Sequence, residues 1–149
     1  INIGDYNMNN KTVFDLYCGT GTITQIMATR AQKVYGIEIV AEAIEKAKEN
    51  AALNGLDNCE FIAGDVLVEV DKLTDSPDII VLDPPRDGIH PKAIINFGAK
   101  ELLYISCKPT SLARDLPILK EAGYSVDKVM CVDMFPQTPH VETVVKLSK

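Results

Sequence analysis

The sequence predicts an α/β fold in which a mostly parallel β-sheet carries helices on both faces. Three observations support this fold class. Short apolar runs alternate with helical stretches along the chain. The runs TVFDLY and DIIVL are almost continuously apolar, as in strands that are buried on both faces. No helical pattern separates the last two β-rich runs, which therefore predict an antiparallel hairpin at the C-terminal end.

The individual elements follow from this alternation in chain order. Strands are expected at residues 12–17, 33–38, 59–63, 78–82, 101–106, 125–133 and 141–147. Helices are expected at residues 23–27, 40–54, 66–73, 91–98 and 110–122. Gly55 and Gly123 directly follow two of these helices, where a left-handed residue commonly ends a helix.

The composition limits the classes of protein that this chain can represent. It has 149 residues, of which 46% are hydrophobic and 24% charged, which fits one folded domain and excludes a disordered tail or a membrane protein. Because the chain begins with Ile1 rather than Met, we expect it to be one domain of a longer protein. Fifteen basic and 21 acidic residues give a net charge of −6, so nucleic-acid binding would need other domains.

The four cysteines predict free thiols rather than a metal site. Cys18, Cys59, Cys107 and Cys131 are widely spaced, and no pair has the CxxC spacing of zinc or iron–sulfur ligands. We therefore expect no metal in this chain, and a reducing, cytoplasmic location. Cys18, Cys59 and Cys131 are interpreted as packing residues.

A nucleoside-binding site is predicted at the edge where the parallel strands end. The first strand leads into Asp15-Leu16-Tyr17-Cys18-Gly19-Thr20-Gly21, where two glycines permit a tight turn and a close approach of the backbone to a ligand. Thr24 stands where a dinucleotide motif has its third glycine, so that motif is not met. Glu38 ends the second strand and can accept the ribose hydroxyls, and Asp65 follows the third strand near an adenine amino group. The alternative is a tight turn with two solvated acids.

This pattern resembles the class I S-adenosylmethionine methyltransferases. The resemblance implies a Rossmann-like, seven-stranded sheet whose last pair forms an antiparallel hairpin, with S-adenosyl-L-methionine as the cofactor. It places Tyr17, Gly19, Gly21 and Thr22 around the methionine part, Glu38 on the ribose and Asp65 on the adenine. Asp15 and Asp83 are also assigned to cofactor binding by this resemblance.

A candidate nucleophile and a rigid acid lie at the same predicted edge. Two prolines restrict the backbone after Asp83 in Asp83-Pro84-Pro85-Arg86. Cys107 ends the fifth strand, and both Lys108 and the N-terminus of the next helix favour its nucleophilic thiolate form. Packing is the alternative role for this cysteine.

Glu142 is a candidate general base near the start of the last strand. It shares one side of that strand with His140, and its apolar neighbours Val141 and Val144 predict partial burial. An edge-strand acid in water is the equally open alternative.

Four motifs together resemble the RNA 5-methyluridine methyltransferases over nearly the whole chain: DLYCGTGT, LDPPRDG, YISCKPTSLARDL and DMFPQTPHVETVV. The resemblance implies that Cys107 is the nucleophile and Glu142 the base, and that Asp83 contacts cofactor or substrate. The last motif looks more like the ribosomal-RNA branch, so 23S ribosomal RNA is the expected substrate rather than transfer RNA. Lys108 stands where the family usually has Asn. The family's upstream Gln-bearing segment, RNA-binding domain and, in some members, iron–sulfur cysteines have no counterpart in this sequence.

Two other functions remain open from the sequence. An amino-group methyltransferase carries a motif similar to Asp83-Pro84-Pro85, although Arg86 replaces the aromatic residue that would stack on an amine-bearing base. Such an enzyme would not need Cys107. A non-catalytic S-adenosylmethionine-binding module would bind the cofactor without methylating any RNA.

Overall fold

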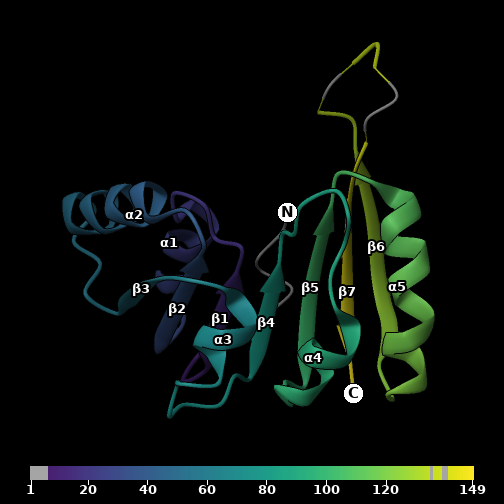
Figure 1. Cartoon of the computed structure of the whole chain (residues 1–149), viewed down its shortest axis with the longest axis horizontal. Helices are drawn as coiled ribbons and strands as arrows, with labels where there is room; N and C mark the ends of the chain where they lie inside the picture. The colour runs from purple at the N-terminus through teal and green to yellow at the C-terminus, as the bar shows by residue number, and fades with distance from the viewer. Residues whose placement is uncertain (1–6, 135, 139–140) are drawn as a thin grey trace.

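Seven strands form one sheet in the order β3-β2-β1-β4-β5-β7-β6 (Figure 1). The structure, a computed structural model, describes residues 7–134, 136–138 and 141–149. The strands are β1 (Thr12–Leu16), β2 (Lys33–Glu38), β3 (Cys59–Ala63), β4 (Ile79–Leu82), β5 (Glu101–Ser106), β6 (Ser125–Val132) and β7 (Glu142–Ser148). The helices are α1 (Thr22–Ala28), α2 (Ala41–Leu53), α3 (Val66–Val70), α4 (Pro91–Asn96) and α5 (Pro109–Glu121).

The predicted α/β fold with a C-terminal hairpin is confirmed. Strands β1 to β5 pair in parallel, whereas β7 is antiparallel to both of its neighbours, β5 and β6. The last strand of the chain is therefore inserted between β5 and β6. This insertion was not predicted, and it brings the start of β7 to the edge where β5 ends.

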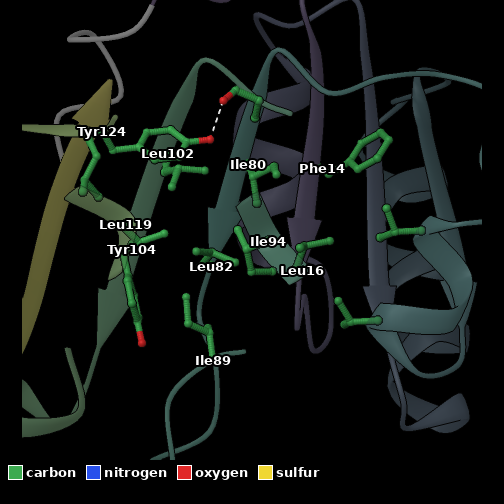
Figure 2. Packing of buried hydrophobic residues seen from close by; sticks show 14 of the residues in the cluster. Phe14, Leu16, Ile80, Leu82, Ile89, Ile94, Leu102, Tyr104, Leu119 and Tyr124 are labelled. Carbon is green, nitrogen blue, oxygen red and sulfur yellow. Dashed lines mark hydrogen bonds between the residues drawn. The ribbon is translucent and has the colours of Figure 1, made fainter. Parts of the chain in front are cut away.

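Each face of the sheet has its own hydrophobic core because side chains alternate along the strands. Phe14 and Leu16 of β1 face a cluster that also holds residues of α3, α4 and α5, part of which Figure 2 shows. Val13, one residue away, faces the opposite cluster with Met27 of α1. Phe61 packs there beside α2 in a third cluster. Helices therefore cover both faces, as predicted.

Several element boundaries differ from the prediction by a few residues. Strand β1 ends at Leu16 because Tyr17 adopts a left-handed backbone with φ of 69°. Helix α5 begins at Pro109, since proline is favoured in the first turn of a helix and has no N–H to satisfy. Helix α3 ends at Val70, three residues early, and the turn that follows is held by the Tyr35 hydroxyl, which donates to Asp75 (2.6 Å). No helix in the described ranges is both long and apolar enough to cross a membrane.

The strand order defines where a ligand would bind. The order in which strands are added to the sheet reverses between β1 and β4. Strands β2 and β3 lie on one side of β1, and the later strands lie on the other. In open α/β sheets, ligands bind beyond the carboxyl ends of the strands at such a switch point. The carboxyl ends of β1, β2, β4 and β5 and the amino end of β7 meet at this edge.

Candidate functional site

The strand register aligns the predicted site residues at one edge of the sheet. Leu16 of β1 pairs with Ile37 of β2 and with Leu82 of β4. The next residue along each strand therefore lies at the same level, where β1 and β4 have ended and β2 has its last residue. These three residues are Tyr17, Glu38 and Asp83. The predicted gathering of side chains from separate strands is confirmed for these positions.

Glu38 is held rigidly at the end of β2 by two backbone hydrogen bonds. The amide of Gly19 donates to Glu38 Oε2 (3.1 Å), and the amide of Val40 donates to Oε1 (3.0 Å). Each carboxylate oxygen has two acceptor positions, so both oxygens can also accept hydroxyl groups. The glycine loop is thereby tied to a carboxylate that is oriented to accept a pair of hydroxyls.

The two glycines of the loop serve different purposes. Both have left-handed backbones, with φ of 54° at Gly19 and 78° at Gly21. A Cβ on Gly21 would lie 2.7 Å from Cε1 of Phe61 and 2.9 Å from Cβ of Ala47, so the loop packs tightly onto the protein interior there. A Cβ on Gly19 would meet nothing within 4 Å. The close approach that the sequence predicted to be toward a ligand is, at Gly21, an approach to the core.

Tyr17 marks the start of this loop by its backbone conformation. A left-handed φ is uncommon for a residue with a side chain and costs on the order of 1–2 kcal/mol. Such strain is concentrated at binding and catalytic sites. Burial raises the pKa of the Tyr17 hydroxyl, and the nearby Asp65 carboxylate raises it further. Tyr17 and Asp65 both line the cleft at this edge.

A cleft of about 560 Å³ opens at this edge, within the usual range for small-molecule sites. Its walls are formed by Tyr17, Glu38, Ile39, Asp65, Val66, Leu67, Asp83, Pro85, Asp87, Gly88 and His90. Four of these residues are acidic. The carboxylates suit a ligand with hydroxyl and amino groups and positive charge, and the exposed Ile39 (69% exposed) offers an apolar surface to a flat ring. This combination fits an adenosine joined to a cationic group.

Some residues of the cleft were predicted and others were missed. Tyr17, Glu38, Asp65 and Asp83 line it as expected. Asp65 also caps α3, where Leu67 N donates to its Oδ1 (2.9 Å). Ile39 and the Asp87–Gly88 turn were missed. The apolar pair Ile39-Val40 directly after an acidic strand end was the available signal for the first of these.

Asp15 lies behind the site rather than in its wall. Its side chain is fully buried on β1 and accepts a hydrogen bond from Thr24 Oγ1 (2.6 Å) through Oδ2. Its Oδ1 has no hydrogen-bond partner in the described part of the chain. Burial raises the pKa of Asp15 to about 7, and the Asp83 carboxylate adds to this effect. Gly19, Gly21 and Thr22 likewise do not line the cleft, so contact of these four residues with the cofactor stays a prediction.

The candidate nucleophile and base lie at the ends of two paired strands. Ser106 of β5 pairs with Thr143 of β7 in an antiparallel register. Cys107 directly follows Ser106 and Glu142 directly precedes Thr143, so they lie where β5 ends and β7 begins, and both side chains are half-buried. Burial raises the pKa of Asp83, and the charge of Glu142 raises it further. Glu142, the first residue of β7, therefore lies at the edge of the sheet where β5 ends and Cys107 follows.

The backbone on either side of Cys107 is fixed by a local motif. Ser106 Oγ donates to the carbonyl of Lys108 (3.0 Å) and accepts from the Lys108 amide (3.2 Å). Cys107 thereby sits two residues before the first turn of α5. The positive end of the dipole of this 13-residue helix is directed to that position.

The other cysteines are distinguished by their burial. Cys18 is buried, which raises the pKa of its thiol to about 12. Cys59 is half-buried, and burial raises the pKa of its thiol as well. Both fit the predicted packing role. Cys131 does not, because its side chain is exposed on the outer strand β6. His140, the candidate companion of Glu142, lies outside the described residues.

Comparisons with known proteins identify the family. The model of a methyltransferase domain family matches residues 7–133, and the chain belongs to this family. It is a class I methyltransferase domain, and its cofactor is S-adenosyl-L-methionine. The site described above fits this cofactor, since Glu38 can hold the ribose and the acidic walls suit a sulfonium ion.

Similar proteins include RNA methyltransferases. An uncharacterised RNA methyltransferase of Clostridium tetani is 57% identical over 143 residues, which cover 94% of this chain and 31% of that protein. One of Clostridium acetobutylicum is 54% identical over 99% of this chain and 32% of its own length. The crystal structure of Pyrococcus abyssi tRNA (uracil-54, C5)-methyltransferase in complex with S-adenosyl-L-homocysteine superposes with a TM-score of 0.80 at 33% identity, over 95% of this chain and 35% of that one. The chain thus spans about a third of the length of these relatives.

Proposed function

We propose that this domain methylates carbon 5 of uracil in RNA, with Cys107 as a covalent nucleophile and Glu142 as the base. The observation that carries the proposal is the register of β5 and β7, in which Ser106 pairs with Thr143, so that Cys107 follows one strand at the edge where Glu142 begins the other. The names of the relatives support RNA as the substrate. The solved relative from Pyrococcus abyssi supports uracil carbon 5 as the target.

The residues account for each step of this reaction. Carbon 5 of uracil is a poor nucleophile, so the Cys107 thiolate first adds to carbon 6, which moves the electrons of the ring double bond toward the carbonyl as an enolate. S-adenosylmethionine, when bound, would supply the electrophilic methyl group: carbon 5 would bond to it as the bond from sulfur to methyl breaks and S-adenosylhomocysteine leaves. Glu142 removes the proton from carbon 5, and the returning electrons re-form the ring double bond and expel the Cys107 thiolate.

We further propose that the domain belongs to a longer, cytoplasmic protein and that its substrate is 23S ribosomal RNA. The form of the segment DMFPQTPHVE supports ribosomal RNA over transfer RNA. A net charge of −6 favours RNA binding mainly through other domains, since phosphate contacts dominate such affinity. The target base would have to leave its stack to reach this edge of the sheet.

Two substitutions in the intact protein test the mechanism. Cys107→Ala should abolish both methyl transfer and covalent capture of RNA. Glu142→Gln should instead stall after methyl transfer, leaving RNA attached through Cys107 in denaturing electrophoresis. Cys59→Ala is the matched control, because this cysteine is half-buried like Cys107 but begins β3, at the edge of the sheet opposite the cleft. The modified nucleotide is mapped in total RNA.

The outcomes separate the proposal from its alternatives. Uridine methylation that persists in Cys107→Ala would refute the covalent mechanism. Methylation of an exocyclic amino group that survives this substitution would favour an amino-group methyltransferase. Cofactor binding without transfer to any RNA would favour a binding module. Normal turnover by Glu142→Gln would assign the base to another residue.

A further inference from the structure

The segment that follows β4 forms one wall of the cofactor cleft and is held from behind by α5. Ser111 Oγ donates to the carbonyl of Arg86 (2.8 Å), and Arg114 Nη2 donates to the carbonyl of Asp87 (2.6 Å). The amide of Ile89 donates to Asp115 Oδ2 (3.2 Å). Three side chains from one side of α5 thus bind three successive parts of the segment 86–89.

Asp115 is the centre of this arrangement. Its side chain is almost completely buried, and its two oxygens accept three hydrogen bonds. Besides the amide of Ile89, Oδ2 accepts from the hydroxyl of Tyr104 (2.8 Å), while Oδ1 accepts from Nε of Arg114 (3.1 Å). A buried carboxylate is stable only when such donors replace its lost water. Asp115 therefore joins α5, β5 and the segment after β4.

The packing around Asp115 leaves little freedom to the segment. A Cβ on Gly88 would lie 2.6 Å from Asp115 Oδ2 and 2.6 Å from Arg114 Nη2, so the backbone passes directly against both side chains. Gly88 also has a left-handed φ of 87°. Ile89 and Tyr104 lie at the same end of the core in Figure 2. The turn at Gly88 thus packs directly against Asp115, which accepts the hydrogen bond from the amide of the next residue, Ile89.

The elements that Asp115 joins are those that carry the reacting groups. Asp83 begins the segment, and Pro85, Asp87 and Gly88 belong to the wall of the cleft. Tyr104 lies on β5 three residues before Cys107, and α5 starts two residues after it. A shift of the segment relative to β5 and α5 would therefore change the position of the bound cofactor relative to the nucleophile.

We propose that Asp115 is a positioning residue. Through Tyr104 and Ile89 it fixes the position of the segment after β4, which forms the cofactor wall of the cleft, relative to Cys107. The part of this proposal that concerns Cys107 rests on the proposed function. The part that concerns the cofactor wall does not, because it is tested by binding of the cofactor product alone. Asp115 itself is buried behind the segment and does not line the cleft.

The test compares two buried tyrosines. Tyr104→Phe removes the hydroxyl that donates to Asp115 and preserves the packing of the ring. Tyr124→Phe is the matched control, since its buried hydroxyl donates to the carbonyl of Ala99 in the same core, away from the cleft. Binding of S-adenosylhomocysteine is measured by calorimetry, exchange of the Gly88 and Ile89 amides by nuclear magnetic resonance, and global stability by urea unfolding.

The two variants should differ in S-adenosylhomocysteine binding and in amide exchange. Tyr104→Phe should weaken S-adenosylhomocysteine binding and accelerate exchange of both amides, each by about tenfold, the scale of one hydrogen bond to a charged acceptor. Tyr124→Phe should lower global stability to a similar extent and leave the dissociation constant and both exchange rates within about twofold. In the intact protein, Tyr104→Phe should also slow methyl transfer at saturating cofactor.

Equal losses of affinity in the two variants would overturn the proposal, because the effect would then be one of general stability. Unchanged affinity and exchange in Tyr104→Phe would overturn it as well. If Tyr104→Phe does not fold, Asp115→Asn provides the test, because it removes the charge that strengthens the bonds from Ile89 and Tyr104, with the same expected direction. Failure of the unaltered protein to methylate uridine would refute the proposed function, while the binding and exchange results would still decide the role of Asp115.

Discussion

Replacing Asp15 by Asn should stabilise the domain, by an amount that grows with pH. Asp15 is fully buried on β1, and its burial raises its pKa from 3.8 to about 7, while the hydrogen bond from Thr24 offsets only part of this effect. The folded protein therefore holds the Asp15 proton more tightly than the unfolded chain does. The stability that this proton contributes is fully present below about pH 4, and it is lost as the pH rises to the folded-state pKa near 7.

The size of the effect follows from the two pKa values. Each pKa unit corresponds to about 1.4 kcal/mol, so ionisation of Asp15 costs the folded state about 4 kcal/mol above pH 7. Asparagine has no proton to lose in this pH range and stays uncharged. Its carbonyl can accept the Thr24 hydroxyl, and its amide group would occupy the place of Oδ1, which has no partner in the described chain. The variant should therefore match the protonated wild type.

Urea unfolding at several pH values measures this difference. The free energy of unfolding of Asp15→Asn minus that of the wild type should be near zero at pH 4 and rise to about 4 kcal/mol at pH 8. Asp71→Asn, at the exposed end of α3, controls for the change in net charge and should give a nearly flat difference. A flat difference for Asp15→Asn, or a variant that is less stable than the wild type at pH 8, would refute the burial argument.

Two further substitutions test the carboxylate at the end of β2 and the packing of the glycine loop. Glu38→Ala removes the carboxylate that is held by two backbone amides, and it should weaken S-adenosylhomocysteine binding by about 1–3 kcal/mol in calorimetry; an unchanged dissociation constant would contradict the ribose assignment. Gly21→Ala should lower the free energy of unfolding by about 2–4 kcal/mol, because its Cβ would lie 2.7 Å from Phe61. Gly55→Ala, where nothing lies within 4 Å, should cost only about 1–2 kcal/mol. Equal losses at the two glycines would show that the contact with Phe61 contributes nothing.

Part of the site was predictable because its signals are local. A carboxylate or a glycine pair directly after an apolar strand lies at the carboxyl end of that strand, and parallel strands share one edge. Glu38, Asp65 and Asp83 were therefore placed correctly without knowledge of the strand order. Asp115 also left a signal, since it falls on the apolar stripe of α5 between Leu112 and Leu119. A charged residue at such a position is expected to be buried with partners, although its partners are not evident from the sequence.

The sequence by itself determined the types of the elements, the parallel sheet with its C-terminal hairpin, and the set of side chains that meet at the binding edge. Only the tertiary structure decided that β7 lies between β5 and β6, that Asp15 is buried behind the cleft, and that Gly21 packs on Phe61. Backbone hydrogen bonds in a sheet do not depend on which strands are neighbours. Strand order is instead selected by the packing of side chains that are distant in the sequence. For this reason the pairing of Ser106 with Thr143, which brings the end of β5 beside the start of β7, emerges only when the whole sheet is assembled.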